Sequence, residues 1–149
     1  MKRWALTAGT LLIIIVSGAV LWGKVTDTQS TLQLVGKSYA ATILTSEDER
    51  EKGLSGTPSL AADRAMLFVF PNDSKWGIWM KDMNYPIDIV WLDSGHKVVH
   101  MVKNAQPSSY PDTIFQPERP ARYVIELVSG TIERTGISTG DIAGMPAGT

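Results

Sequence analysis

Most apolar residues after position 37 occur in short runs, and several of these runs alternate with polar residues at the two-residue period of a β-strand. The run at residues 65–70 is apolar throughout, which favours a strand buried on both faces of a sheet. Turn-forming residues separate the runs. We therefore predict strands at residues 39–44, 65–70, 77–81, 87–92, 97–102, 122–128 and 137–142.

Two short helices are predicted from capping signals. Residues 46–49 have the S-x-x-E form of a capping box, so a helix should occupy residues 47–52 and end at Gly53. We interpret its acidic run as a solvent-exposed face that suits the helix dipole. A second helical turn should open at residues 129–130 and end at Gly136.

The segments between the predicted strands indicate a hairpin and a long loop. Residues 93–96 should join the strands on either side of them, with Gly95 in the left-handed conformation. Four prolines between Pro107 and Pro120 predict a surface loop without regular structure. Together these elements predict a mainly β (α+β) domain over residues 37–145, a small antiparallel barrel-like rolled sheet of about seven short strands with two short helices.

The N-terminal segment has a different pattern. Residues 4–23 carry no charge, and as a helix rising about 1.5 Å per residue they would span about 30 Å, the thickness of a bilayer core. Lys2 and Arg3 precede them, which predicts a single-pass anchor in the cell membrane with its N-terminus in the cytoplasm. The small residues at 17–19 leave a cleaved secretory signal as the alternative. Both interpretations place the domain outside the cytoplasm.

The segments that flank the predicted domain are short. Residues 24–36 are rich in Thr, Ser and Gln and indicate a linker, at whose end residues 32–35 could start a strand. Residues 146–149 form a C-terminal tail.

Composition and charge exclude several classes of protein. Hydrophobic residues make up 44% and charged residues 19% of the chain, a globular rather than a disordered composition. Two of the 14 basic residues precede the apolar run, so the remainder carries 12 basic residues against 15 acidic ones, which argues against nucleic acid as a partner. The absence of Cys excludes disulfides, thiolate zinc sites and cysteine nucleophiles. The sequence shows no cofactor motif, so we predict no cofactor.

Six motifs follow one another between residues 38 and 142. They are E-x-x-R-x-x-G-L at residues 47–54, M-L-F-V-F at 66–70, W-M-K at 79–81, P-I-D-I at 86–89, P-A-R-Y-V-I-E-L at 120–127 and G-I-x-x-G-D at 136–141. In this order they resemble the bacterial and archaeal family called domain of unknown function 192. The resemblance implies a compact, mostly β domain, often carried behind a signal or an anchor, with no established activity.

Three positions depart from the pattern of that family. Ser55 replaces the usual Met after Gly-Leu, Ala65 replaces the Gly before Met-Leu-Phe, and Asp82 with Met83 replaces the Asn-Thr after Trp-Met-Lys. Because the first and third departures adjoin candidate site residues, we expect a ligand preference that differs from other members.

Asp88 is an informative polar residue, because the strand around it is otherwise apolar. A buried carboxylate without a partner costs several kcal/mol, so a cation or a set of backbone donors must face it. The cations available within the motifs are Arg50, Lys81 and Arg122. Asp88 is then either a structural clasp that sets strand register or a residue that faces a ligand, and we favour the clasp.

Aromatic residues supply a second candidate site. Trp79 shares its predicted strand face with Lys81 and a glycine, a face with little to bury, so Trp79 could line a pocket. Trp91 lies on an apolar strand and should belong to the core. His96 and His100 would lie about 13 Å apart on an extended strand, too far to bind one ion, so we predict no metal site.

Two functional hypotheses follow. In the first, the domain is a membrane-tethered binding module without catalytic activity, whose shallow pocket holds a small polar ligand or a cell-envelope saccharide. In the second, it is a hydrolase of cell-envelope material that uses Asp88 and Glu126 as acid and base. We favour binding because the sequence shows no nucleophile, metal or cofactor motif. The candidate ligand-binding residues are Trp79, Lys81, Asp88, Arg50 and Glu126.

Overall fold

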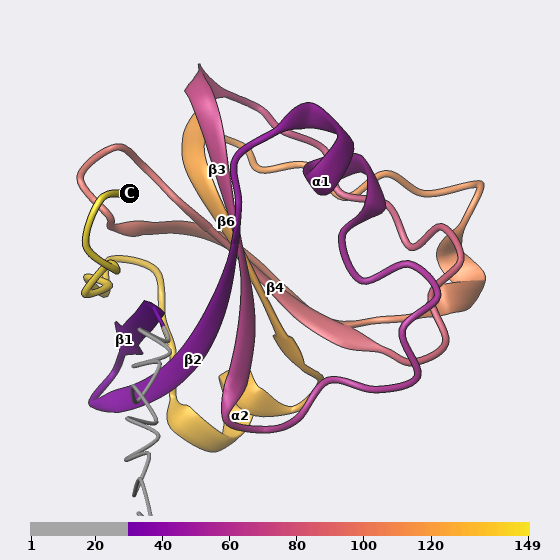
Figure 1. Cartoon of the computed structure of the whole chain (residues 1–149), viewed down its shortest axis with the longest axis horizontal. Coiled ribbons are helices and arrows are strands. Elements are labelled where there is room, and N and C mark those ends of the chain that lie inside the picture. The colour runs from indigo at the N-terminus through magenta and orange to yellow at the C-terminus, as the bar shows by residue number, and fades with distance from the viewer. Residues whose placement is uncertain (1–29) are drawn as a thin grey trace, which may run out of the picture.

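The computed structural model describes residues 30–149, which form a six-stranded mixed sheet with two short helices (Figure 1). The predicted anchor or signal at residues 4–23 lies outside the described residues, as do residues 24–29 of the predicted linker. Within residues 30–149, no helix combines the length and the apolar character needed to cross a membrane.

The strands are β1 Ser30–Leu34, β2 Lys37–Leu44, β3 Arg64–Ser74, β4 Ile87–Leu92, β5 Val98–Ala105 and β6 Ala121–Val128. They lie in the order β1-β2-β3-β6-β4-β5. Every neighbouring pair is antiparallel except β2 and β3, which run parallel. Parallel neighbours need a crossover connection, and residues 45–63 supply it together with helix α1 (Glu47–Lys52). The sheet is therefore mixed, where the prediction was antiparallel.

Strand β1 lies within the stretch that was predicted as a linker. Its residues Leu32 and Leu34 are 0% and 1% exposed, so β1 is part of the folded domain that we predicted to begin at residue 37. A tight turn follows, in which Val35 and Gly36 both have positive φ, and it returns the chain into β2. The sequence analysis allowed a strand to start at residues 32–35, and the observed strand begins slightly earlier, at Ser30.

Two predicted strands are missing from the sheet of the described residues. Residues 77–81 and 137–142 each make one isolated bridge, Ile78 with Phe115 and Ile142 with Lys97. The first segment faces the proline-rich loop, whose prolines have no N–H with which to continue a ladder. In the second segment, glycine 140 has a φ of 101°, which interrupts the extended backbone. Five predicted strands remain, and with β1 the sheet has six strands rather than seven.

The two edge strands, β1 and β5, are not neighbours in the sheet, so the predicted barrel-like closure is replaced by an open sheet. Residues 140–144 lie between the two edges and bond to both. The backbone N–H of Gln33 donates to the Gly144 carbonyl at 2.8 Å, and that of Val98 donates to the Asp141 carbonyl at 2.8 Å. The C-terminal segment thus protects backbone groups that an open sheet would leave unpaired.

Both predicted helices are confirmed. At the start of α1, Ser46 Oγ accepts a hydrogen bond from the Glu49 N–H at 3.3 Å, and the Glu49 carboxylate accepts one from the Ser46 N–H at 2.9 Å, which completes the capping box. Helix α2 (Thr131–Thr135) lies between two left-handed glycines. The proline-rich loop contains one short 3₁₀ helix, Pro107–Ser109, because proline fits the first position of a helix.

The hairpin of β4 and β5 is confirmed, but its turn uses a different residue from the one predicted. His96, with a φ of 64°, takes the left-handed conformation, and Gly95 does not. Asp93 Oδ1 accepts hydrogen bonds from the N–H groups of Gly95 and Lys97, both at 2.9 Å, and these bonds fix the turn. The His96 ring packs edge-on against Tyr123 at a centroid distance of 5.2 Å, which helps to hold its conformation.

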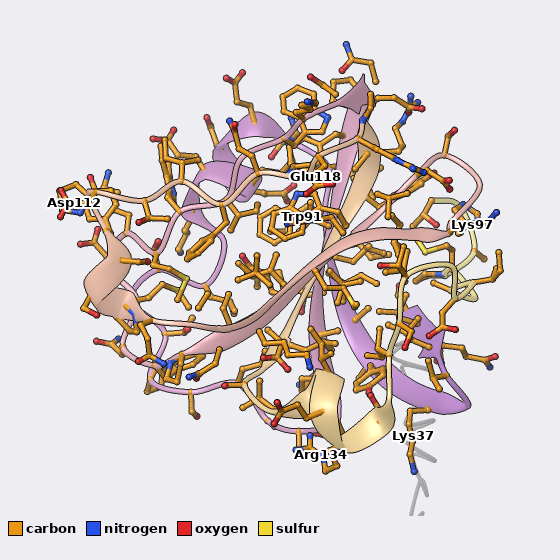
Figure 2. All side chains as sticks on the ribbon, turned by 180° about the vertical axis from the view of Figure 1, so that it is seen from behind. Lys37, Trp91, Lys97, Asp112, Glu118 and Arg134 are labelled. Atoms are coloured by element: carbon orange, nitrogen blue, oxygen red, sulfur yellow. The ribbon has the colours of Figure 1, made fainter. Side chains whose placement is uncertain are left out.

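Alternating side chains divide the core into two clusters, one on each face of the sheet. On the face that we call the α2 face, Val90 and Leu92 of β4 pack in one cluster with Ile132 of α2. On the opposite α1 face, Ile89 and Trp91 pack in a second cluster with residues that flank α1. Trp91 is fully buried, as predicted, and lies in the interior of the domain in Figure 2. The cavity described in the next section lies on the α1 face.

Candidate functional site

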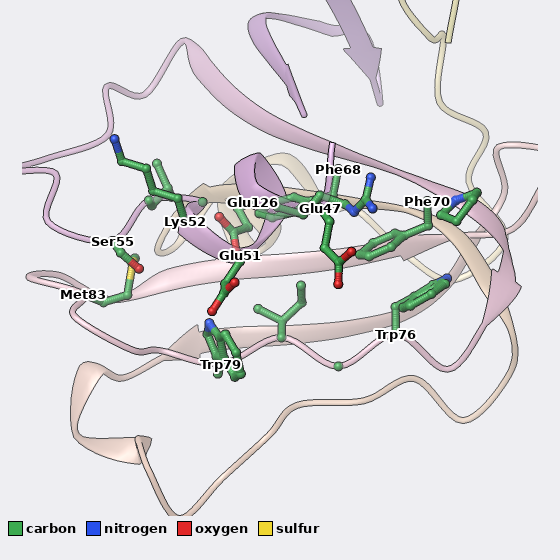
Figure 3. Close-up of a pocket in the computed structure, with 16 residues that line it drawn as sticks. Glu47, Glu51, Lys52, Ser55, Phe68, Phe70, Trp76, Trp79, Met83 and Glu126 are labelled. Atoms are coloured by element: carbon green, nitrogen blue, oxygen red, sulfur yellow. The ribbon is translucent and has the colours of Figure 1, made fainter. Parts of the chain in front are cut away.

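A cavity of about 530 Å³ opens on the α1 face (Figure 3). Helix α1 and the turn after it, strand β3 and the segment 76–83 enclose this cavity, and β6 contributes one side chain, Glu126. The volume falls in the range of about 300–1,000 Å³ that is typical of small-molecule sites.

The periods of the helix and the strand bring the lining side chains together. Glu47 and Glu51 are four residues apart on α1, so they share one face of the helix, and both line the cavity (Figure 3). Phe68 and Phe70 alternate on β3 and line the same cavity. At Gly53, which ends α1, an added Cβ would lie 3.2 Å from the Phe68 ring, and the φ of 44° is also unfavourable for other residues. Glycine therefore lets the end of α1 pack closely on β3.

Aromatic rings form one wall of the cavity. The rings of Phe70 and Trp76 stack with their centroids 4.4 Å apart and their planes at 10°, and the Trp76 indole donates to the Asn72 carbonyl at 2.9 Å. Trp79 also lines the cavity, as predicted, and is 39% exposed. Lys81 Nζ lies 5.9 Å from the centroid of the Trp79 ring, but Lys81 lines an adjoining hollow rather than the cavity itself. The wall thus combines a fixed stacked pair with a solvent-accessible indole.

Arg50 is a fixed part of the same wall. Its Nη1 donates to the backbone carbonyls of Thr45 and Val69, the latter at 3.0 Å. The guanidinium carbon lies 5.2 Å from the centroid of the Phe70 ring, within the range of a cation–π contact. Arg50 therefore ties the start of α1 to β3 and faces the cavity, and it does not serve as the partner of Asp88.

Glu126 brings a buried carboxyl group to the cavity. The residue is 4% exposed, and Oε2 has no hydrogen-bond partner among the described residues. Its neighbours directly across the strands are Met66 and Ile89, both apolar. Burial raises the pKa of Glu126 from 4.5 to about 8. At neutral pH this side chain is therefore a carboxylic acid, which can donate a hydrogen bond as well as accept one.

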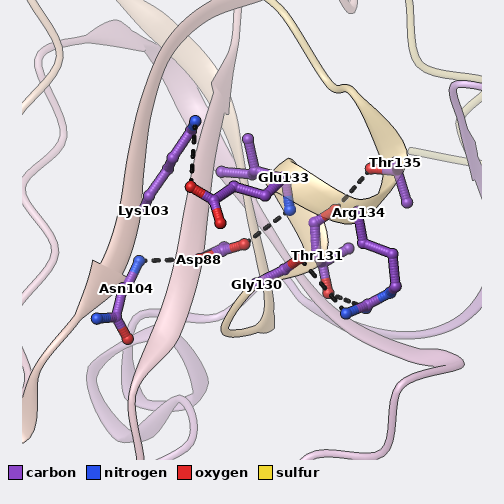
Figure 4. Close-up of polar contacts among 9 residues, drawn as sticks. Asp88, Lys103, Asn104, Gly130, Thr131, Glu133, Arg134 and Thr135 are labelled. Carbon is purple, nitrogen blue, oxygen red and sulfur yellow. Dashed lines mark hydrogen bonds and ion pairs between the residues drawn. The ribbon is translucent and has the colours of Figure 1, made fainter.

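Asp88 is a hydrogen-bonded clasp on the α2 face (Figure 4). It is 1% exposed; Oδ1 accepts from the backbone N–H of Asn104 in β5 at 2.9 Å, and Oδ2 accepts from that of Ile132 in α2 at 2.8 Å. Asn104 has a φ of 52° and accepts a hydrogen bond from Ser129 Oγ through its side chain at 2.7 Å. Asp88 thus joins three elements through backbone donors, which is the structural role that we favoured.

The sheet register separates Asp88 from Glu126. In the antiparallel pair of β4 and β6, Glu126 lies opposite Ile89, and Asp88 lies opposite Leu127. Successive side chains of a strand point to opposite faces, so the two carboxyl groups lie on different sides of the sheet. They cannot serve together as acid and base on one substrate, so they do not form the pair of carboxyl groups that the hydrolase hypothesis requires.

The cavity also contains residues that sequence analysis did not assign to a ligand site. Glu47 and Glu51 belong to the acidic run that we interpreted as a solvent-exposed helix face; both are exposed, as predicted, and both also line the cavity. Their spacing of four residues, with Arg50 between them, was the available signal for a shared face. Phe70 lies in β3 and Trp76 in the segment that follows it, and the stacking of these two rings was not predicted.

The histidines pack against aromatic rings. His96 contacts Tyr123, and His100 lies edge-on to Trp91 at a centroid distance of 5.3 Å. In residues 30–149, no group of three or more His, Asp or Glu side chains is placed to hold a metal ion.

The fold and the site define a class of small mixed-sheet domain with an aromatic-walled cavity beside a capped helix. The chain belongs to the DUF192 family, described as uncharacterised ACR, whose family model matches residues 29–144. This match confirms the family that the six sequence motifs resemble.

Archaeal proteins named UPF0127 protein are similar to this chain in sequence. The relative from Thermococcus sibiricus is 32% identical over 95 residues, which cover 62% of this chain and 57% of the relative. The relative from Pyrococcus furiosus is 31% identical over 81 residues, which cover 51% of this chain and 63% of the relative. The chain thus matches less than two thirds of the length of these relatives.

Two crystal structures share the fold, each with a TM-score of 0.72. One is a protein of unknown function from Novosphingobium aromaticivorans, 24% identical, with a match that covers 76% of this chain and 83% of that one. The other is described as a candidate transcription regulator from Sinorhizobium meliloti, 28% identical, with a match that covers 78% of this chain and 92% of that one.

Replacing Asp88 by Asn should destabilise the fold, because an amide can accept through only one of its two terminal atoms. The N–H of Asn104 or of Ile132 would then face an NH₂ group. We expect Asp88→Asn to lower the free energy of unfolding in urea by about 1–3 kcal/mol, the cost of an unsatisfied buried donor.

The matched control for this substitution is Asp93→Asn. Asp93 accepts both of its hydrogen bonds through Oδ1 alone, which asparagine keeps, so the loss should stay below about 1 kcal/mol. An Asp88→Asn variant as stable as the unchanged chain would contradict the clasp.

Proposed function

We propose that this domain binds a small polar ligand, in the first place a cell-envelope saccharide, in the cavity on the α1 face. The observation that carries the proposal is the buried, unpartnered carboxyl group of Glu126 at a cavity with an aromatic wall. Native structures leave few buried polar atoms without a partner, so such an atom calls for an explanation. Aromatic faces suit the apolar face of a sugar ring, and the polar side chains suit its hydroxyl groups.

The wall of the cavity is held in place without a ligand, which supports a binding role. The capping box fixes α1, the two carbonyls hold Arg50, and Phe70 and Trp76 stack on each other. A preorganised site loses less conformational entropy when its ligand binds. The exposed indole of Trp79 remains available for stacking against a ring.

We propose a binding domain rather than an enzyme. The catalytic hypothesis required Asp88 and Glu126 in one cleft, but the register of β4 and β6 directs their side chains to opposite faces of the sheet. Binding requires only the aromatic wall and the polar groups that line the cavity.

We also propose that residues 4–23 place the domain outside the cytoplasm, as a membrane anchor or as a cleaved signal, where envelope saccharides are accessible. A reporter that works only outside the cytoplasm, fused after Thr149, should be active. Full-length protein in the membrane fraction would identify the anchor, and a shorter secreted product would identify the signal. A soluble, full-length cytoplasmic protein would contradict both versions.

Trp79→Ala should abolish ligand binding and leave the fold largely intact. Because the residue is 39% exposed, the loss of unfolding free energy should be smaller than the ~3–5 kcal/mol typical of a core aromatic. The measurement is the melting temperature of the purified full chain with millimolar N-acetylglucosamine, glucose, cellobiose or maltose, since a ligand bound only by the folded state raises stability.

Tyr110→Ala is the control for this experiment, because Tyr110 is 41% exposed and does not line the cavity. It should keep the ligand-induced rise in melting temperature. An unchanged chain that responds to none of the four sugars, or a Trp79→Ala variant that responds as strongly as the unchanged chain, would refute the proposed function.

A further inference from the structure

We infer that the ligand is uncharged where it meets Glu126, and that the carboxyl group of Glu126 donates a hydrogen bond to one of the ligand's oxygen atoms. This inference rests on the proposed binding function and adds to it the charge class of the ligand and the role of one residue. The observation behind it is a carboxyl group that is 4% exposed, lines the cavity and has an unpartnered Oε2.

The ionisable groups that line the cavity balance one another. Helix α1 contributes two carboxylates, Glu47 and Glu51, and two cations, Arg50 and Lys52. The lining residues of β3 and of the segment 76–83 are uncharged. With Glu126 in its acid form, the lining has no net charge and gives neither a cation nor an anion an electrostatic advantage.

Among the described residues, no cation forms an ion pair with Glu126. The ion pairs join Lys103 with Glu133 and Arg122 with Asp73. Desolvation therefore raises the pKa of Glu126 to about 8, and the carboxyl group keeps its proton through the neutral range. That proton is free for donation to an acceptor in the cavity.

A cationic ligand fits this arrangement less well. Arg50 already lies over the Phe70 ring at 5.2 Å, and Lys81 lies over the Trp79 ring at 5.9 Å, so a ligand cation at either ring would be repelled by a cation of the protein. A bound cation could form an ion pair with Glu126 only if the carboxyl group lost its proton in an apolar environment. A sugar hydroxyl, ring oxygen or amide carbonyl accepts from the acid form without either cost.

The test follows the binding of N-acetylglucosamine, an uncharged sugar, to the full chain by tryptophan fluorescence across a pH series. The dissociation constant should stay nearly constant below about pH 7 and rise about tenfold per pH unit well above pH 8, as Glu126 loses its proton. Glu126→Gln keeps an uncharged donor, so it should bind within about threefold of the unchanged chain at pH 7 and lose the pH dependence. Glu126→Leu should bind at least about tenfold more weakly at every pH, because no donor remains.

Three results would overturn the inference while leaving the proposed function in place: an affinity that rises with pH, an affinity of the unchanged chain that ignores pH, or a folded Glu126→Gln variant that does not bind. Glucosamine, measured at a pH where its amine is protonated, should bind more weakly than N-acetylglucosamine, and tighter binding would also overturn it. If neither N-acetylglucosamine nor the other three sugars bind, the proposed function fails and the inference fails with it. The pH series on the unchanged chain decides the matter even if a variant does not fold.

Discussion

A carboxyl group that leaves water must find hydrogen-bond donors or keep its proton, and this constraint accounts for both buried acids of the sheet. Asp88 meets two backbone N–H groups, one from β5 and one from α2, and accepts from both. Glu126 meets apolar neighbours on β3 and β4, and burial raises its pKa to about 8. Alternation along β4 and β6 sends the first to the α2 face and the second to the α1 face. One face of the sheet therefore holds the hydrogen-bonded Asp88, and the other holds the cavity that Glu126 lines.

The two faces of the sheet are packed differently. On the α2 face, Asp88 holds the short helix α2 against the sheet, where Ile132 completes a core cluster. On the α1 face, the crossover between the parallel strands β2 and β3 carries a capped helix over a cavity instead of over a filled core. An unpartnered buried acid is a local violation of the rules that the rest of the fold obeys, and such violations concentrate at functional sites. Among residues 30–149, Glu126 is the buried acid that departs from those rules.

Sequence reasoning succeeded where the signal is local. The apolar runs of β3, β4 and β6, the capping box of α1 and the glycines around α2 all depend on neighbouring residues. Each element lies where it was predicted, except that β3 continues past residue 70 to Ser74. Reasoning failed where partners are distant in sequence: the parallel pairing of β2 with β3, and the bonds from residues 140–144 to both sheet edges. The same limit applies to the site. Trp79, Arg50 and Glu126 were identified by residue type and context, but the face that each carboxyl group takes depends on a one-residue register that no local pattern determines.

The most direct test of this account is the pH dependence of unfolding for the unchanged chain and for Glu126→Gln. The pKa of Glu126 is raised from 4.5 to about 8 in the folded state, so between these values the folded protein holds a proton that the unfolded chain has lost. The contribution of Glu126 to the free energy of unfolding is therefore fully present below its unfolded-state pKa. It is lost as pH rises toward the folded-state pKa, by up to about 1.4 kcal/mol per pH unit. We predict that the unfolding free energy of the unchanged chain, relative to Glu126→Gln, falls between about pH 5 and pH 8 and then levels off. A difference that is constant over this range, or that grows with pH, would contradict a buried, unpartnered Glu126.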